Sequence, residues 1–262
     1  MSNSSGVGIM SQFFFNRLAG RFDFPKNYTC VDIETSGLNP TSNLICSIGH
    51  TIVRDCKPVD TSLSYLNWTS EIAIDQAQLI YDLNTVQRHM EAKGKAFLHS
   101  YSTLREKGRP PRIVLNEYLQ LFELMEENDE IMVCHNGFAF DVPFLENTIS
   151  RWVLSVLRER FEFNPDLVYD TGIIEKASQL PLDGIINPLP SADETMKDFA
   201  ARIGKIRMAG IYWALDGYCN DKYNLMEKAG VDMSMAHAAD TDSLLTHYLL
   251  EEQRRQAYGD NS

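Results

Sequence analysis

The hydrophobic positions in the first quarter of the chain form three apolar runs separated by turn residues. Residues 28–33 are aromatic, β-branched and apolar, which predicts a buried strand. Residues 44–53 and 62–68 have the same character, and short turns connect the three runs. Because strands joined in series by short connections tend to be neighbours, we predict an antiparallel three-stranded meander that begins a sheet.

Further along the chain, apolar positions recur at helical spacing. Residues 112–127 are the strongest example, and the apolar run at 131–134 predicts a fourth strand. The other predicted elements are helices at 143–158, 171–177 and 241–252, a weak strand at 167–169, and shorter helical signals at 85–89 and 101–106. The order βββαβαβα predicts an α/β fold, with a mixed central sheet flanked by helices.

Neither a repeat nor a linker divides the sequence. We therefore expect a single domain over residues 1–262, with a core at about 26–252 and insertions near 71–110 and 179–215. The second insertion is rich in proline and predicts irregular structure. Residues 1–20 predict a flexible start followed by a short packed helix. No apolar run approaches the roughly 20 residues that cross a membrane, so no membrane contact is expected.

Charge and cysteine content narrow the classes of function. The formal net charge of −12 argues against a protein that holds nucleic acid by phosphate neutralisation alone. It does not exclude an enzyme whose metal ions meet the phosphate. The five cysteines include no C-x-x-C pair, and Cys30 and Cys134 lie in apolar runs as small buried hydrophobes. A reducing compartment is expected, and we assign the protein to the cytoplasm.

Two acids end the first predicted strand. Asp32 and Glu34 are two residues apart, so their side chains point to the same face of the strand. Neighbouring acids at the end of an apolar strand are costly to bury, and no Lys or Arg lies between Lys26 and Arg54. A divalent cation with oxygen ligands would offset that cost. The alternative is a solvated strand end that runs into a Ser-Gly turn.

A third acid, Asp141, follows the fourth predicted strand in the sequence H-N-G-F-A-F-D. Sites in open α/β sheets form in such loops beyond the carboxyl ends of strands. Asp141 also precedes a predicted helix, and a simple N-cap is the structural alternative. A fourth acid, Asp242, lies five residues after His237. The two can converge only if His237 lies on the loop that enters the last helix and Asp242 lies in its first turn, with Asp240 or Thr241 as the cap.

The order and spacing of D-x-E, H-N-x-x-x-x-D and H-x-x-x-x-D resemble the Exo I, Exo II and Exo III motifs. These define the DEDDh branch of the DnaQ-like 3′–5′ exonucleases, and the resemblance implies a ribonuclease-H-like fold. It also implies that four metal-binding acids fall on Asp32, Glu34, Asp141 and Asp242, and that His237 is the general base. The five-residue step from His237 to Asp242 marks the His branch.

The resemblance implies two Mg²⁺ or Mn²⁺ ions, which suit four carboxylates and a phosphodiester substrate. Single-stranded or frayed 3′ ends of DNA or RNA would be the substrate, released as nucleoside monophosphates. The predicted substrate contacts are Thr35, Ser36, Leu38 and Asn136, with Leu38 as an apolar wedge against the terminal base. The motifs leave DNA and RNA undistinguished, and a homodimer or a polymerase partner in trans stays open.

Two other classes of function compete with this interpretation. One is a catalytically silent module of the same fold that binds nucleic acid or protein; such a module is expected to lack one of the acids or the His, and all five are present. The other is an unrelated metal-dependent hydrolase, for which the sequence lacks a spacing such as H-E-x-x-H.

Overall fold

The computed structural model describes residues 14–154, 159–182, 187–207, 214–232 and 237–259, and a mixed sheet lies at its centre. The strands are β1 (Tyr28–Thr35), β2 (Ile45–Arg54), β3 (Lys57–Tyr65), β4 (Ile131–Cys134) and β5 (Val168–Asp170). Their order across the sheet is β3-β2-β1-β4-β5. The pairs β1–β2 and β2–β3 are antiparallel, and β1–β4 and β4–β5 are parallel. The predicted meander and mixed sheet are confirmed.

The third strand begins five residues earlier than predicted, because the turn from β2 takes only Asp55 and Cys56. Both residues have positive φ, 48° and 62°, as a two-residue type I′ hairpin turn requires. Trp68, predicted to lie in this strand, lies instead in the short 3-10 helix η1 (Trp68–Ser70). Its ring N–H donates to the carbonyl of Ile45 at 2.6 Å, which satisfies its one polar atom inside the core.

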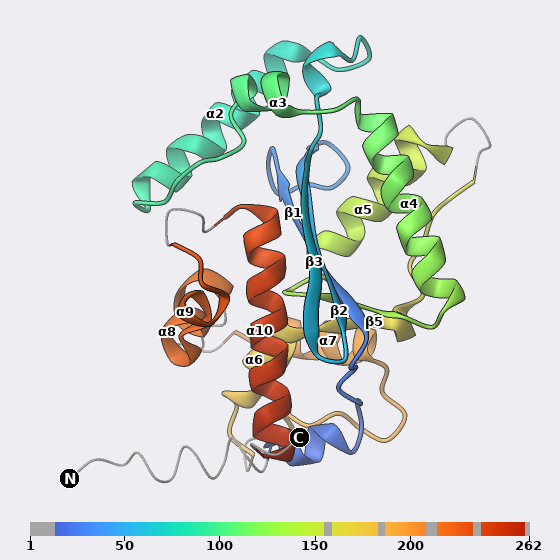
Figure 1. Ribbon diagram of the computed structural model, residues 1–262, viewed down its shortest axis with the longest axis vertical. Coiled ribbons are helices and arrows are strands. Elements are labelled where there is room, and N and C mark those ends of the chain that lie inside the picture. Colours follow the sequence, from blue (N-terminus) through green and yellow to red (C-terminus); the bar gives the residue numbers. More distant parts are fainter. Residues whose placement is uncertain (1–13, 155–158, 183–186, 208–213, 233–236, 260–262) are drawn as a thin grey trace.

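Helices cover both faces of the sheet (Figure 1). They are α2 (Gln76–Ala92), α3 (Tyr101–Lys107), α4 (Pro111–Glu127), α5 (Asp141–Trp152), α6 (Thr171–Ser178), α7 (Met196–Gly204), α8 (Asn220–Tyr223), α9 (Leu225–Ala229) and α10 (Ala239–Tyr258). Two further short turns are η3 (Pro165–Leu167) and the π-helical η4 (Leu215–Cys219). In Figure 1, α4 and α5 lie on one side of the sheet and α10 lies on the other, while α2 and α3 lie beyond one end of the strands.

The two faces of β1 confirm the predicted alternation of side chains. Val31 and Ile33 belong to the core cluster that contains α4 and α5 residues. Tyr28 and Cys30 belong to the cluster of α6, α7 and α10, which also takes in Phe15 from a helical segment at 14–19. All five cysteines are free thiols. None of the described helices is long and apolar enough to cross a membrane.

Two helix starts differ from the predictions. The helix predicted at 143–158 is α5, which begins at Asp141 and ends at Trp152; residues 155–158 lie outside the described part. The helix predicted at 241–252 is α10, which begins two residues earlier because the chain turns at His237 and is extended at Ala238. The caps predicted at Asp240 or Thr241 are therefore wrong, since both residues are already helical and Ala238 is the N-cap.

The two segments predicted to be insertions contain more structure than their composition indicates. Residues 71–110 form α2 and α3, whose N-caps Asp75 and Ser100 each accept hydrogen bonds from backbone N–H groups one turn on. The second insertion, predicted to be irregular, contains α7, which is capped by Thr195 and buries Phe199 and Ile203. The prolines around α7 dominate the sequence pattern and hide its short apolar stripe. Residues 183–186 and 208–213 lie outside the described part.

Candidate active site

Strand β1 carries the first two acids to the end of the sheet that α2 and α3 cover. Asp32 lies opposite Gly49 of β2, and Glu34 lies opposite Ser47, just before a bulge in the pairing. Both acids are half-buried. They lie on the opposite face from Val31 and Ile33, which places them on the side of α10.

His237, on the loop that enters α10, and Asp242, in the first turn of α10, lie near Glu34 of β1. One ligand atom from each of Glu34, His237 and Asp242 lies within 4.8 Å of the others, a spacing that one metal ion could bridge. His237 Nδ1 is 3.9 Å from Asp242 Oδ2, and the backbone N–H of His237 points to Asp242 Oδ1 at 3.4 Å. The predicted arrangement, with His237 on the entering loop and Asp242 in the first turn, is confirmed.

Gly49 explains why α10 can lie so close to the sheet. A Cβ atom built on Gly49 would lie 2.0 Å from the carbonyl carbon of Ala239, the first residue of α10. Only a residue without a side chain fits there. One helical turn further along α10, the hydroxyls of Thr51 on β2 and Ser243 on α10 hydrogen-bond at 2.9 Å. The start of α10, and with it Asp242, is therefore held directly against the strand that pairs with Asp32.

Asp141 reaches the cluster from the other side of β1. Its Oδ1 accepts the backbone N–H of Ile33 at 3.1 Å, and its side chain is 2% exposed. Asp141 is the first helical residue and Phe140 is the N-cap of α5, with no side-chain cap hydrogen bond. The predicted N-cap alternative is therefore wrong. The carboxylate is turned toward β1, where it binds the N–H of Ile33, the residue between the two acids of the D-x-E sequence.

The loop before α5 is held by an acid that sequence analysis missed. Asp170, at the end of β5, accepts backbone N–H groups of Asn136 (2.9 Å) and Phe138 (3.3 Å). It also caps α6 by accepting the N–H groups of Gly172 and Ile173, both at 3.1 Å. Asp170 is fully buried, and burial raises its pKa to about 6. An acid between a strand and a helix start is the only signal that the sequence gives for it.

The pKa of Asp32 shows how crowded the acids are. Burial raises the pKa of the Asp32 carboxyl well above its ordinary range, and the charges of Asp242, Asp141 and Glu34 raise it further. Burial also raises the pKa of Asp141, to about 8. Within the described part of the chain, no Lys or Arg forms an ion pair with Asp32 or Asp141. Crowded carboxylate oxygens of this kind fit a hard divalent cation such as Mg²⁺ or Mn²⁺.

A second histidine, which sequence analysis also missed, lies against this cluster. His99 comes from the first insertion, between α2 and α3, and is 2% exposed. Its Nε2 lies 3.0 Å from the carbonyl oxygen of His237 and 3.9 Å from Glu34 Oε2, and its Nδ1 lies 3.3 Å from the hydroxyl of Ser47. Burial lowers the pKa of His99 to about 4, which keeps the ring neutral at physiological pH.

The predicted substrate contacts lie at the end of β1, in the turn that follows it, and in the loop before α5. Thr35, the last residue of β1, and Ser36, the first residue of the turn, are both buried: the Thr35 hydroxyl donates to Gly37 O at 2.5 Å, and Ser36 Oγ accepts the N–H of Leu44 at 3.0 Å. Leu38, at the tip of that turn, is 86% exposed. Asn136 lies in the loop before α5 with a positive φ of 62°.

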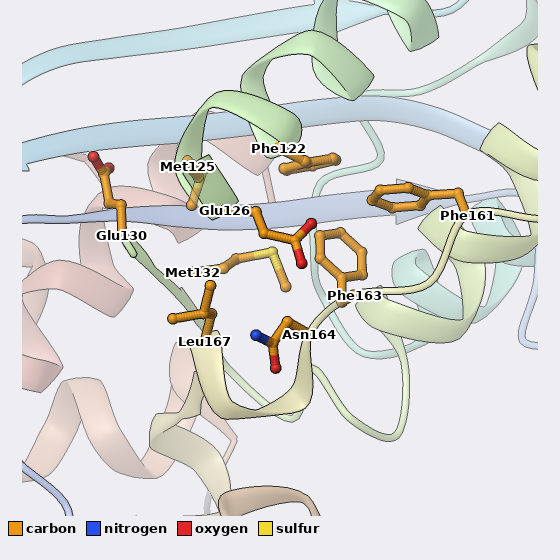
Figure 2. Close-up of a pocket in the computed structure, with 9 residues that line it drawn as sticks. All are labelled: Phe122, Met125, Glu126, Glu130, Met132, Phe161, Phe163, Asn164 and Leu167. Atoms are coloured by element: carbon orange, nitrogen blue, oxygen red, sulfur yellow. The ribbon is translucent and has the colours of Figure 1, made fainter. Parts of the chain in front are cut away.

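A separate pocket lies between α4 and residues 161–167, and Figure 2 shows the side chains that line it. Phe122, Phe161 and Phe163 form its aromatic wall, with ring centroids 4.8–6.1 Å apart. None of the four acids lines it, and neither does His237. We interpret this pocket as imperfect packing of the loop after α5 against α4, separate from the acidic cluster.

Comparisons with known proteins support the fold. No family model matches the sequence, and no curated protein is similar to it in sequence. The structure is similar to that of E. coli exonuclease I in its zinc-bound complex with single-stranded DNA, with a TM-score of 0.51 and 15% identity over 88% of this chain and 41% of the other. A further exonuclease I structure aligns with a TM-score of 0.53 and 16% identity, covering 89% and 42% of the two chains.

The chain thus spans less than half the length of these structural neighbours. At this level of identity the similarity shows the fold alone. The predicted ribonuclease-H-like fold, with a mixed sheet flanked by helices, is confirmed.

Proposed function

We propose that this protein is a metal-dependent 3′–5′ exonuclease of the DEDDh type, which removes nucleoside monophosphates from single-stranded or frayed 3′ ends. The observation that carries the proposal is the cluster of Glu34, His237 and Asp242 at the end of β1, with Asp32 close enough to these acids and to Asp141 for their charges to raise its pKa. The acids come from β1, α5 and α10, and the charges of three of them raise the pKa of the fourth. The exonuclease fold of the structural neighbours is consistent with this chemistry.

Asp32, Glu34, Asp141 and Asp242 would hold two divalent ions, Mg²⁺ or Mn²⁺. When bound, such ions clamp the non-bridging phosphate oxygens, acidify the attacking water and offset charge on the leaving oxygen. The chain supplies the geometry for them: Ile33 N–H fixes the Asp141 carboxylate, and the loop N–H of His237 points to Asp242.

His237 is the proposed general base. An imidazole has an ordinary pKa near 6.5, which suits proton transfer near neutral pH. It takes a proton from the water as the water oxygen bonds to phosphorus. The bond between phosphorus and the 3′-oxygen of the penultimate nucleotide breaks, and that oxygen gains a proton. The products are a nucleoside 5′-monophosphate and a strand one nucleotide shorter, with a new 3′-hydroxyl.

Leu38 is the proposed contact to the terminal base. It is a large apolar side chain, 86% exposed, on the turn that directly follows the two acids of β1. An apolar surface that stacks on a base tolerates every sequence, as an exonuclease requires. Thr35, Ser36 and Asn136 would line the same position through the turn and the loop before α5.

The free cysteines favour a reducing compartment such as the cytoplasm as the place of action.

The test is a time course with 5′-labelled single-stranded DNA and RNA in Mg²⁺, Mn²⁺ or EDTA. We expect a ladder that shortens from the 3′ end with either metal and intact substrate in EDTA. Asp32→Asn should abolish the ladder, because it removes one ligand charge and keeps the shape. Cleavage in EDTA, or products released from the 5′ end, would contradict the proposal. Binding of the substrate without cleavage would favour the catalytically silent module.

A further inference from the structure

His99 links the first insertion to the catalytic loop. Its buried ring lies beside Tyr65 and Phe97, whose ring centroids are 6.0 Å and 5.8 Å from its own. From that position Nε2 reaches the carbonyl oxygen of His237 at 3.0 Å, and Nδ1 reaches the hydroxyl of Ser47 at 3.3 Å. Nε2 is 3.9 Å from the Glu34 carboxylate, too far for a hydrogen bond.

These contacts define which nitrogen carries the proton. A carbonyl oxygen can only accept, so the short contact to His237 requires the proton on Nε2. In the neutral ring Nδ1 then has a lone pair, and it accepts the hydroxyl proton of Ser47. Ser47 belongs to β2, opposite Glu34 in the sheet register. The tautomer of His99 is therefore set by the His237 carbonyl, and the Ser47 hydroxyl of the sheet is compatible with it.

The backbone of His237 needs this support. Its φ of 68° lies in the left-handed region, which non-glycine residues adopt at a cost and keep only where neighbouring groups hold them. Two contacts with described residues help to hold it. The N–H of His237 points to Asp242 Oδ1, and its C=O accepts from His99. The first contact comes from α10 itself, whereas the contact with His99 ties the loop to another part of the molecule.

We infer that His99 is a positioning residue, which fixes the His237 loop so that the His237 imidazole faces the acids of β1. The first insertion is then part of the active site, in addition to any role at the substrate rim. This inference rests on the proposed function only where turnover is measured, because the conformation of the His237 loop can be measured without substrate.

A pair of amide variants isolates the hydrogen bond. In His99→Gln the side-chain amide can reach the position of Nε2 and donate to the carbonyl of His237. In His99→Asn the amide ends near the position of Nδ1 and cannot reach it. We expect His99→Asn to lower kcat by roughly 10–100-fold, the range for losing the partner that orients a functional histidine, with KM nearly unchanged. His99→Gln should recover most of the lost kcat. His89→Ala, at an exposed histidine of α2, is the matched control.

The second measurement is NMR of histidine-labelled protein without substrate. We expect His99 as the Nε2–H tautomer, and one set of His237 ring signals in wild type, His89→Ala and His99→Gln. In His99→Asn these signals should broaden or divide. If His99 of the wild-type protein carries its proton on Nδ1, that result alone would overturn the inference. So would a His99→Asn protein with unchanged His237 signals, or equal losses of kcat in the Gln and Asn variants. A wild-type protein without nuclease activity but with these signals would refute the proposed function alone.

Discussion

His237 is the residue at which the proposed chemistry can be separated from metal binding. Its ring lies beside Asp242, but the four proposed metal ligands are carboxylates, and the Asp141 carboxylate is bound by the N–H of Ile33. Removing the imidazole takes away the proton acceptor and leaves every proposed metal ligand in place. His237→Ala should therefore lower turnover by roughly 10²–10⁴-fold with substrate binding nearly intact. Single-turnover assays and binding of a 3′-end oligonucleotide in Ca²⁺ measure the two effects separately. If His237→Ala cleaves at the wild-type rate, His237 is only a loop residue and is not the general base.

A second prediction at the scale of single residues concerns Leu38→Ala. Because its side chain is 86% exposed, its removal should leave the melting temperature unchanged. It should weaken binding of 3′ ends by about 1–3 kcal/mol, the range for one base-stacking contact. Val59→Ala, at an exposed apolar residue of β3, is the control for nonspecific surface effects. Equal affinities for wild type and Leu38→Ala would remove Leu38 from the substrate site.

The individual residues differ in how far the sequence predicted them. Asp32 and Glu34 could be predicted because strand periodicity alone fixes which face they share. His99 could not, because it lies in a polar segment and acts on the backbone of a residue 138 positions away. Asp170 was missed for a related reason. Its two roles, as the cap of α6 and the anchor of the Asn136 loop, depend on the parallel neighbours β4 and β5, and that pairing is tertiary.

At the scale of elements, the site depends on how close α10 lies to β2. The sequence predicted the helix and its apolar face. It did not predict the contact at Gly49, because a glycine in a strand does not indicate which element packs against it. The limits of helices and strands were also predicted less well, because they depend on backbone turns that the sequence pattern does not show. The start of α10 follows from the turn at His237, and the start of β3 follows from positive φ at Asp55 and Cys56.

Gly49→Ala tests this contact. The new Cβ would lie 2.0 Å from the backbone of Ala239, and backbone cannot move aside as a flexible side chain can. We expect a loss of about 1–3 kcal/mol in the free energy of unfolding, the usual cost of overpacking, and a weaker Mn²⁺ affinity because Asp242 moves with the helix. Denaturant melts and calorimetric Mn²⁺ titration measure both. Gly204→Ala is the matched control, since its Cβ would meet only Ile173 Cδ1, at 3.9 Å. Unchanged Mn²⁺ affinity in Gly49→Ala would show that the start of α10 does not set the metal site.

At the scale of the whole molecule, folding brings three acidic segments together in a chain that already carries a net charge of −12. The site lies where the carboxyl end of β1, the start of α10 and the first insertion meet, and Figure 1 shows α2 and α3 beyond that end of the sheet. Without a cation, mutual repulsion there opposes folding. Metal binding and stability are therefore linked: Mn²⁺ at a hundred times Kd should stabilise the protein by about 2.7 kcal/mol.

Asp141→Asn measures that linkage. The pKa of Asp141 in the fold, about 8, is raised above its ordinary value of 3.8, so the folded state holds this proton more tightly than the unfolded chain does. Its contribution to stability is then present below about pH 4 and is lost as pH rises from there to about 8. The amide removes the charge and can still accept the N–H of Ile33 through Oδ1.

In EDTA at pH 8 we expect the melting temperature of Asp141→Asn to lie above that of wild type, with a smaller difference at pH 5. In Mn²⁺ the variant should gain less thermal stability than wild type and be inactive. Thermal melts at both pH values, with and without Mn²⁺, measure these differences, and Asp166→Asn is the control for an exposed acid. If Asp141→Asn melts below wild type in EDTA at pH 8 and gains as much from Mn²⁺, Asp141 serves only to hold β1, and the four-acid site is wrong.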